Sequence, residues 1–299
     1  MTPLTLDHLV IAVRDVEAAS ANYRRLLGLA PSWRGRHPQY GTANVLFRLE
    51  NCYVELLAPD AEGADSPWRQ SLERHLATAG EGLYAIALGT DDIAAAVSLA
   101  RSHGLAVLDP ADGDGVDLDS GARREWTNAR MPEEATRGVR AFLIQHRSPA
   151  AALPEARPLA EDGAAVAAVD HVVVGSSHLA ASLRLWHEAL GLDLRLTLDR
   201  PGGRRLYFLR LGDAILELAG EAPALSEAEG PPERPGERDL LWGAAYRVGD
   251  VARTVERLRG EGVELSDPRP GNAPGTLVAD LKPGFSHEVR TLLIEKASP

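Results

Sequence analysis

The chain is predicted to adopt an α+β fold of four βαβββ modules, which form two duplicated domains whose curved mixed β-sheets enclose cups. Three features of the 299-residue sequence indicate this fold. A strand–helix–glycine pattern occurs four times, the copies alternate between two kinds, and a Pro/Ala-rich stretch separates the two halves.

The repeated pattern consists of an apolar strand, a polar break, a helix and a glycine. The four copies are HLVIAVRDVEAASANYRRLLGL from His8, YAIALGTDDIAAAVSLARSHGL from Tyr84, HVVVGSSHLAASLRLWHEALGL from His171 and GAAYRVGDVARTVERLRGEGV from Gly243. Asp15, Asp92 and Asp250 precede three of the helices and are predicted N-caps, because a carboxylate accepts the free amides of a first turn. The glycines that end the helices are expected in a left-handed conformation; they are Gly28, Gly104, Gly191 and Gly262.

Copies one and three form one kind, since they end in LLGL and ALGL and share a later hairpin, VLFRLENCYVELLAP against LYFLRLGDAILELAG. The order A-B-A′-B′ indicates that a two-module domain was duplicated. We expect domains at residues 1–149 and 167–299, joined by a linker at 150–166. The connector SPWRQSLERHLAT in the first half is expected to be helical, whereas EAPALSEAEGPPERPGERD in the second half is expected to be a loop.

The overall charge and the single cysteine exclude several classes of function. A formal net charge of -11 argues against nucleic-acid and anionic-membrane binding, because phosphate contacts need clustered Lys and Arg. Neither a basic leader nor a membrane-spanning apolar run is present, which favours a cytoplasmic protein. Cys52, the only cysteine, cannot form an intrachain disulfide and is expected to be a small buried strand residue. The expected partner is a small molecule, and a homodimer is compatible with the sequence.

The opening LDHLVIAVRDVEAASANYRRLLGL, followed by CYVELLAP, resembles the vicinal oxygen chelate superfamily of glyoxalases, bleomycin-resistance proteins and dioxygenases, in particular its glyoxalase-like branch. The resemblance covers nearly the whole chain apart from the linkers. It implies the fold, but one fold hosts many reactions.

Strand alternation predicts which side chains face the cups. In the first strand the fully apolar set Leu9, Ile11 and Val13 should pack on the helix, which leaves His8 inward. The same alternation turns His171 inward, and it places Glu55 and Glu217 within otherwise apolar strands. A carboxylate buried there needs a cation or a hydrogen-bond donor.

By resemblance, metal-binding members of the family place ligands on the first and last strands of each module, which correspond here to His8 and Glu55 and to His171 and Glu217. Imidazole and carboxylate suit zinc, nickel, iron, manganese or magnesium. The sequence departs from the family pattern in the second and fourth modules, where Ala85, Phe142, Gly243 and about Leu292 occupy the equivalent positions. Each cup would then hold half of a ligand quartet, which argues against an extradiol dioxygenase.

Three arrangements remain open. His37 or His146 adds a ligand beside His8 and Glu55, or modules one and three face each other and assemble a single quartet, or no metal binds. His37 is expected in a loop and His146 at the surface. The segment ADGDGVDLDSG from Ala111 lacks the final glutamate of an EF-hand and is expected to be an acidic turn.

The functional hypothesis is a divalent-metal-dependent lyase, isomerase or oxygenase that acts on a small oxygenated substrate. His37 and Asn44 are the expected catalytic helpers, and Tyr40, Thr42 and Trp126 are expected to bind substrate. The alternative is a metal-free binding or resistance protein that sequesters an apolar ligand. The second half offers DRPGGRRLYFL where the first offers this polar cluster, so the N-terminal cup is the expected working site.

Overall fold

A computed structural model describes residues 3–160, 163–221 and 238–296. The N-terminal half contains β1 (Thr5–Ala12), α1 (Val16–Leu27), β2 (Trp33–His37), β3 (Thr42–Arg48), β4 (Tyr53–Pro59), α2 (Pro67–Thr78), β5 (Gly82–Gly89), α3 (Ile93–Ser102), β6 (Ala111–Asp117), β7 (Arg123–Met131) and β8 (Ala141–His146). The C-terminal half contains β9 (Val166–Ser176), α4 (Leu179–Leu183), β10 (Asp193–Arg200), β11 (Arg204–Leu211), β12 (Ala214–Glu221), β13 (Leu240–Val248), α5 (Val251–Gly260), β14 (Arg269–Pro270), β15 (Leu277–Asp280) and β16 (Arg290–Glu295). Short 3-10 helices cover Ala150–Ala152 and Pro283–Ser286.

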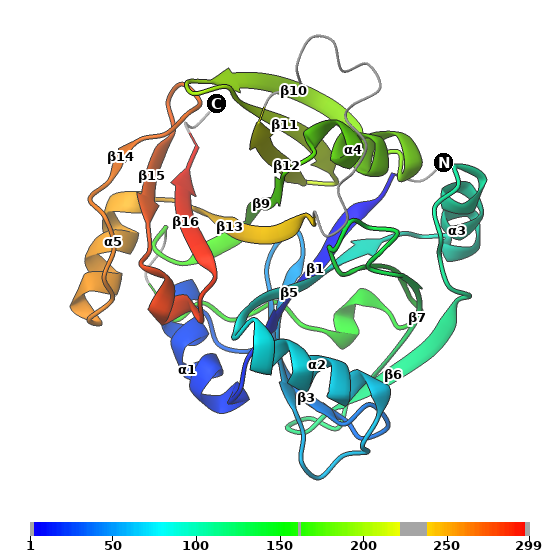
Figure 1. The fold of residues 1–299 in the computed structure, drawn as a ribbon. Coiled ribbons are helices and arrows are strands. Elements are labelled where there is room, and N and C mark those ends of the chain that lie inside the picture. The colour runs from blue at the N-terminus through cyan, green and yellow to red at the C-terminus, as the bar shows by residue number, and fades with distance from the viewer. Residues whose placement is uncertain (1–2, 161–162, 222–237, 297–299) are drawn as a thin grey trace.

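The strand order confirms the predicted α+β fold of four βαβββ modules (Figure 1). The first two modules close into a barrel with the order β1-β4-β3-β2-β6-β7-β8-β5, whereas the last two form an open sheet with the order β10-β11-β12-β9-β13-β16-β15-β14. In each module the first strand runs parallel to the last and antiparallel to the first strand of the neighbouring module. The domain limits proposed from the sequence stay a prediction.

The parallel strand pairs have the same register in all four modules. Glu55 lies opposite Val10, and its counterparts lie opposite the matching positions: Phe142 opposite Ala87, Glu217 opposite Val173 and Leu292 opposite Ala245. The apolar substitutions in modules two and four therefore fall at the positions expected from the sequence. Among the described residues, each sheet therefore carries one His–Glu pair at these strand positions.

The predicted helix caps form. The Asp15 carboxylate accepts hydrogen bonds from the amides of Glu17 and Ala18, and Asp92 and Asp250 cap α3 and α5 in the same way. The glycines expected at the helix ends have φ values between 67° and 81°. In the third module, α4 continues as a π-helix over Arg184–Ala189.

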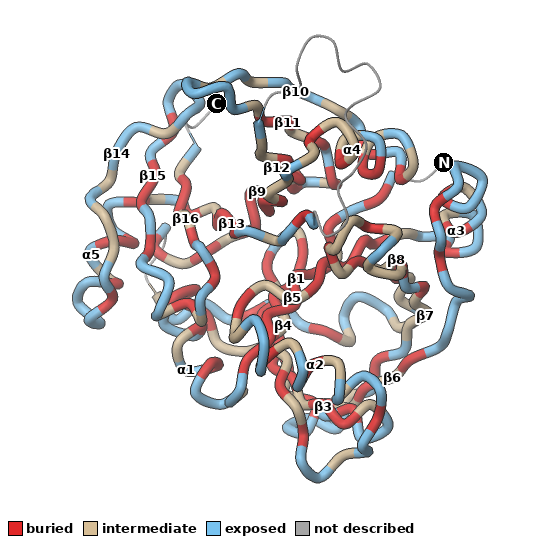
Figure 2. Tube along the Cα trace, in the orientation of Figure 1, coloured by how far each residue is buried: buried red, intermediate tan, exposed pale blue. Residues whose placement is uncertain are grey.

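One continuous apolar core joins the two halves. Buried residues are concentrated along β1, β5, β9 and β13 (Figure 2), and the core cluster includes Leu9 and Ile11 from β1 together with Val172 and Val174 from β9. At 25–30 cal/mol for each Å² of buried apolar surface, a shared core of this kind strongly favours a fixed arrangement of the halves. Asn51 adds a polar link, because its side-chain amide donates to the carbonyl of Val169 and accepts from the amide of the same residue.

Two local expectations were wrong. Most of the acidic segment from Ala111 is not a turn: Ala111–Asp117 form strand β6, because they pair with both β7 and β2 and close the barrel, and the turn is confined to Leu118–Ser120. The glycines of β6 make room for an aromatic ring, since a Cβ on Gly113 would lie 2.4 Å from Nε1 of Trp126. His37 is likewise the last residue of β2 and not part of a loop.

The connector in the first half is helical as predicted, namely α2. The Pro/Glu-rich loop predicted between modules three and four lies mostly outside the described residues. Within the described ranges, no helix has the length and apolar character needed to cross a membrane.

Candidate functional site

The N-terminal barrel encloses a cavity of about 520 Å³. Residues that the sequence singled out come together in its wall: His8, His37, Tyr40, Thr42, Asn44, Glu55 and Trp126. Glu55 and Asn44 come from the neighbouring antiparallel strands β4 and β3, and His8 comes from β1, which pairs with β4. Closure of the barrel therefore places the predicted ligand pair and the predicted polar cluster in one cavity.

His8 and Glu55 face each other at the centre of this wall. The distance from His8 Nε2 to Glu55 Oε2 is 3.5 Å, and both side chains are largely buried, with 4% and 12% of their surfaces exposed. The His8 ring stacks on Tyr53, with ring centroids 4.3 Å apart, and meets the edge of Phe142 at 5.5 Å. These aromatic contacts fix the orientation of the imidazole.

Asp7 is a functional candidate that the sequence reasoning missed. Its carboxylate accepts a hydrogen bond from His8 Nδ1 over 2.6 Å and lies 2.9 Å from His146 Nε2. Despite burial, which raises the pKa of Asp7, its bonds to His146 and His8 hold that pKa well below the ordinary value. The signal was present in the sequence, since an aspartate directly precedes both His8 and His171.

His146 is therefore not the surface residue expected from the sequence. It is partly buried and reaches the far side of Asp7, so it contacts neither Glu55 nor Nε2 of His8 in the described structure. The proposed repair in which His146 completes a ligand set beside His8 and Glu55 is not supported by this placement. His146 instead helps to hold the Asp7 carboxylate.

The His8–Glu55 pair fits two ligand positions of a divalent ion. Because Nδ1 of His8 is bonded to Asp7, Nε2 is the nitrogen left for a ligand, as in many metal sites. Two ligand atoms at about 2.1 Å from one ion stand roughly 3.0–3.4 Å apart in octahedral or tetrahedral geometry, close to the spacing observed here. Asn44 Nδ2 donates to Glu55 Oε1 over 2.8 Å, and Asn44 Oδ1 is a buried acceptor with no partner in the described structure.

The site offers a metal ion two protein ligands, His8 and Glu55. Among residues 3–160, 163–221 and 238–296, no group of three or more His, Cys, Asp or Glu side chains could hold a metal ion. An ion at His8 and Glu55 would therefore take its other ligands from water, substrate or a neutral oxygen such as that of Asn44.

A second polar cluster surrounds His37. Its Nδ1 lies 3.1 Å from Thr42 Oγ1, and its ring lies 6.0 Å from the rings of both Tyr40 and Trp126. Burial lowers the pKa of His37, an effect that Glu55 and Asp114 oppose in part. A neutral imidazole facing a cavity near neutral pH is suited to accept a proton.

The C-terminal cup repeats the ligand pair in a more open setting. Asp170 accepts from His171 Nδ1 over 2.9 Å, and His171 Nε2 lies 3.8 Å from Glu217 Oε2. Burial raises the pKa of Glu217. The pocket of about 380 Å³ beside Glu217 is bordered by Arg200 and Arg204. The two His–Glu pairs thus belong to different sheets, and Glu55 and Glu217 line different pockets, so the alternative in which the pairs form a single quartet is wrong.

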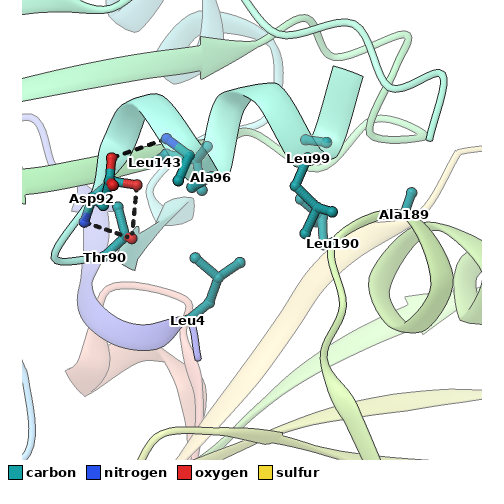
Figure 3. A pocket seen from close by; sticks show the side chains of 10 residues that line it. Leu4, Thr90, Asp92, Ala96, Leu99, Leu143, Ala189 and Leu190 are labelled. Carbon is teal, nitrogen blue, oxygen red and sulfur yellow. Dashed lines mark hydrogen bonds between the residues drawn. The ribbon is translucent and has the colours of Figure 1, made fainter. Parts of the chain in front are cut away.

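Another pocket lies between the two halves and has a different character (Figure 3). It measures about 190 Å³ and lies between α3 and the segment that contains Ala189 and Leu190. Its polar groups are already engaged, since Asp92 caps α3 through the amide of Ala95 and exchanges hydrogen bonds with Thr90. This pocket offers packing surface and no free reactive group.

Comparison with curated proteins finds local similarity to epimerases. The ethylmalonyl-CoA/methylmalonyl-CoA epimerase of Cereibacter sphaeroides is 37% identical over 103 residues, which are 34% of this chain and 73% of that protein. The mitochondrial methylmalonyl-CoA epimerase of Homo sapiens is 38% identical over 92 residues, 31% of this chain and 49% of that protein. The chain thus spans about half the length of the human relative.

Two solved structures share the fold over the whole chain. A mutant of 4-hydroxymandelate synthase from Streptomyces coelicolor aligns with a TM-score of 0.66 and 16% identity, covering 100% of this chain and 95% of that one. The Mn(II)-bound glyoxalase from Novosphingobium aromaticivorans aligns with a TM-score of 0.63 and 16% identity, covering 100% and 84%. At these identities the likeness shows the fold alone.

Family models match both halves. Residues 6–168 match a glyoxalase-like domain, and residues 168–280 match the glyoxalase/bleomycin resistance protein/dioxygenase superfamily. The first match alone covers more than half of the chain, in agreement with the repeated βαβββ modules and the two His–Glu pairs. The chain belongs to the glyoxalase-like family of the vicinal oxygen chelate superfamily.

Proposed function

We propose that the N-terminal cup is the active site of a divalent-metal-dependent lyase, isomerase or oxygenase that acts on a small oxygenated substrate. The observation that carries the proposal is the facing of His8 Nε2 and Glu55 Oε2 at 3.5 Å in the wall of a large cavity. The second polar atom of each side chain is already engaged, by Asp7 and Asn44 respectively. The two facing atoms are therefore held ready for a common partner.

When bound by His8 and Glu55, a divalent ion supplies Lewis-acid stabilisation of negative charge on substrate oxygen. The chain's own residues provide the rest. Asp7 fixes the His8 tautomer, and Asn44 orients the Glu55 carboxylate. His37, with Nδ1 bonded to Thr42, accepts a substrate proton at Nε2, and its lowered pKa keeps it unprotonated beforehand.

Among the three reaction classes, the isomerase has the support of named relatives. The similar proteins from Cereibacter sphaeroides and Homo sapiens are both epimerases, and their identity to this chain exceeds 35% over the matched residues. A base such as His37 beside a site that stabilises an anion is the machinery that proton transfer at carbon requires.

Metal analysis tests the proposal directly. Protein purified without chelators is expected to retain one equivalent of a divalent metal, detected by inductively coupled plasma mass spectrometry, and Glu55→Gln should lose it. Glu50→Gln is the matched control, because Glu50 lies in the same hairpin but is exposed and pairs with Arg247 at 3.2 Å. Equal metal content in the wild type and Glu55→Gln would contradict the assignment.

A second candidate is a metal-free binding protein that encloses its ligand in the same cavity. The observation in its favour is that, within the described ranges, each cup offers only one His–Glu pair, whereas catalytic zinc sites use three protein ligands. Under this alternative the wild type carries no stoichiometric metal, yet it binds a ligand that fits the cavity in the presence of EDTA.

A further inference from the structure

Strand β7 turns an unusual face into the cavity. Alternation places Arg124, Trp126, Asn128 and Arg130 on one side of this strand, and all four line the cavity. A strand face that only closed a core would be apolar. Two arginines, an amide and an indole on one inward face are instead typical of a ligand-binding site.

Arg124 is the most informative of the four. It is only 7% exposed, and within the described ranges no carboxylate lies within ion-pair distance of it. Its guanidinium carbon lies 5.2 Å from the Tyr53 ring centroid and 5.6 Å from that of Trp33. These cation–π contacts and a hydrogen bond with Tyr53 offset only part of the cost of burying a charge, so among the described residues Arg124 lacks the anionic partner that a buried charge needs.

Neighbouring arginines show that Arg124 is exceptional. Arg123, which points out of the barrel, is exposed and pairs with Asp114 at 3.0 Å. Arg140 also lines the cavity, but its charge is balanced by Glu133 at 2.8 Å. The other carboxylate in the cavity wall, Glu55, accepts from Asn44 and faces His8.

At the mouth of the cavity, Arg130 adds a second positive charge. It is exposed, stacks over Trp68 at 4.1 Å, and has no carboxylate partner among the described residues. A local excess of positive charge inside a low-dielectric cup attracts anions even though the whole chain is acidic.

The wall of the cavity is rich in aromatic side chains. Seven of the 15 Trp, Tyr and Phe residues of the chain line this one cavity: Trp33, Tyr40, Tyr53, Trp68, Tyr84, Trp126 and Phe142. Such walls favour a planar or aromatic ligand body. Tyr53 lies between Arg124 and His8, since it contacts the guanidinium on one side and stacks on the imidazole at 4.3 Å.

Arg124 also borders a smaller cavity of about 280 Å³, which is shared with Asp7, Glu50 and His146. Two carboxylates there disfavour an anion, and Tyr53 is its only Trp, Tyr or Phe residue. The larger cavity is therefore the better place for the body of a ligand whose charge meets Arg124.

We propose that the N-terminal cavity binds an aromatic carboxylate, with its anionic group on the Arg124 guanidinium and its ring among the aromatic side chains beside His8 and Glu55. This proposal rests on the assignment of the cup as the functional site and names its ligand class, but it requires no metal. The carboxylate can accept two parallel N–H bonds from the guanidinium, a geometry that lysine cannot reproduce.

Isothermal titration calorimetry with 2-naphthoate and its neutral analogue 2-naphthamide tests the proposal in buffer that contains EDTA. The acid should bind the wild type about tenfold or more tightly than the amide, because a hydrogen-bonded charge pair is replaced by a neutral contact. Arg124→Gln should abolish this preference while changing the affinity for the amide by no more than about twofold. Arg123→Gln, one residue away on the outer face, should leave both affinities unchanged.

Two further variants protect the test if Arg124→Gln does not fold. Arg124→Lys keeps the charge and should retain a reduced preference for the acid. Arg130→Gln, at an exposed position, should weaken binding of the acid by about threefold and leave the amide unaffected. The EDTA in the buffer separates the arginine contribution from any metal site.

The proposal is overturned if the wild type binds the acid and the amide equally or fails to bind the acid. It is also overturned if Arg124→Gln weakens both compounds alike, or if Arg123→Gln removes the preference. Failure of the metal assignment gives a different pattern, namely no retained metal together with an intact preference for the acid.

Discussion

Asp7 accepts a hydrogen bond from Nδ1 of the adjacent His8 over 2.6 Å. The contact is reproduced in the second domain by Asp170 and His171 at 2.9 Å. The two aspartates differ in their second ion-pair partner, which is His146 for Asp7 in the first domain and Lys296 for Asp170 in the second. A carboxylate that accepts from one ring nitrogen leaves the other nitrogen as a lone-pair donor and raises its basicity.

Replacement of Asp7 by Asn should therefore weaken the metal site without removing a ligand. We expect Asp7→Asn to lower the affinity for a divalent ion by about 10- to 100-fold, the usual cost of losing such an outer carboxylate. Calorimetric titration of the metal-stripped protein with MnCl2 measures the change. Asp170→Asn is the control and should leave the N-terminal site intact; unchanged affinity in Asp7→Asn would show that Asp7 only packs against His8.

The buried His37 makes stability depend on pH. Burial lowers its pKa below the ordinary 6.5, so the unfolded chain takes up the proton at a higher pH than the folded protein does. The stabilisation that comes from the neutral form is complete above the unfolded pKa and is lost progressively as the pH falls below it. Urea unfolding at about pH 7.5 and about pH 5 should show a larger loss of stability in the wild type than in His37→Gln.

The matched control for this measurement is His103→Gln, which alters an exposed histidine. It should follow the wild-type dependence on pH. If His37→Gln and the wild type lose the same free energy of unfolding over this range, the burial of a neutral imidazole at position 37 is refuted.

Cys52 is expected to be chemically silent in the folded protein. The thiol is buried as expected but lies directly before β4 and not within a strand, and burial raises its pKa to about 12. At about pH 8 only on the order of one thiol in ten thousand is ionised, so dithionitrobenzoate should react at a rate limited by unfolding. The same protein in guanidinium chloride should release one equivalent of chromophore at once. Rapid reaction of the native protein would contradict the burial.

The sequence predicted the features that depend on repetition. Because the spacing within each module is preserved, comparison of the copies identified Phe142 and Leu292 as the counterparts of Glu55, and the strand registers confirm both. Local chemistry also predicted the three aspartate caps. These features are set by residues a few positions apart or by copies of one pattern.

The sequence did not reveal the features that depend on pairing between strands far apart in the chain. Nothing in ADGDGVD has an apolar period, and β6 becomes a strand only because its backbone pairs with β2 and β7. The Asp7–His8 bond escaped for another reason, since simple alternation assigns neighbouring residues to opposite faces of a strand. The inward face of β7 was recognisable only in part: Trp126 was selected, whereas Arg124 and Arg130 required knowledge of barrel closure.

Barrel closure also distinguishes the N-terminal cup from the C-terminal cup. In the first domain β2 pairs with β6, whereas the described part of the second domain shows no equivalent pairing between β10 and the two-residue strand β14. The N-terminal cavity is accordingly the larger, about 520 Å³ against about 380 Å³. Its His–Glu pair is also closer, at 3.5 Å against 3.8 Å.

We therefore expect His8→Ala to abolish retained metal and His171→Ala to leave it unchanged, as measured by mass spectrometry of protein purified without chelators. The pairs His8–Glu55 and His171–Glu217 offer the same ligand atoms, so a difference between the variants must come from their surroundings. The C-terminal pair is wider, at 3.8 Å against 3.5 Å, and its histidine side chain is more exposed, at 15% against 4%, so it is less well arranged to hold a common ion. Loss of metal in His171→Ala alone would reverse the assignment of the working cup, and equal partial loss in both variants would mean that each cup holds an ion of its own.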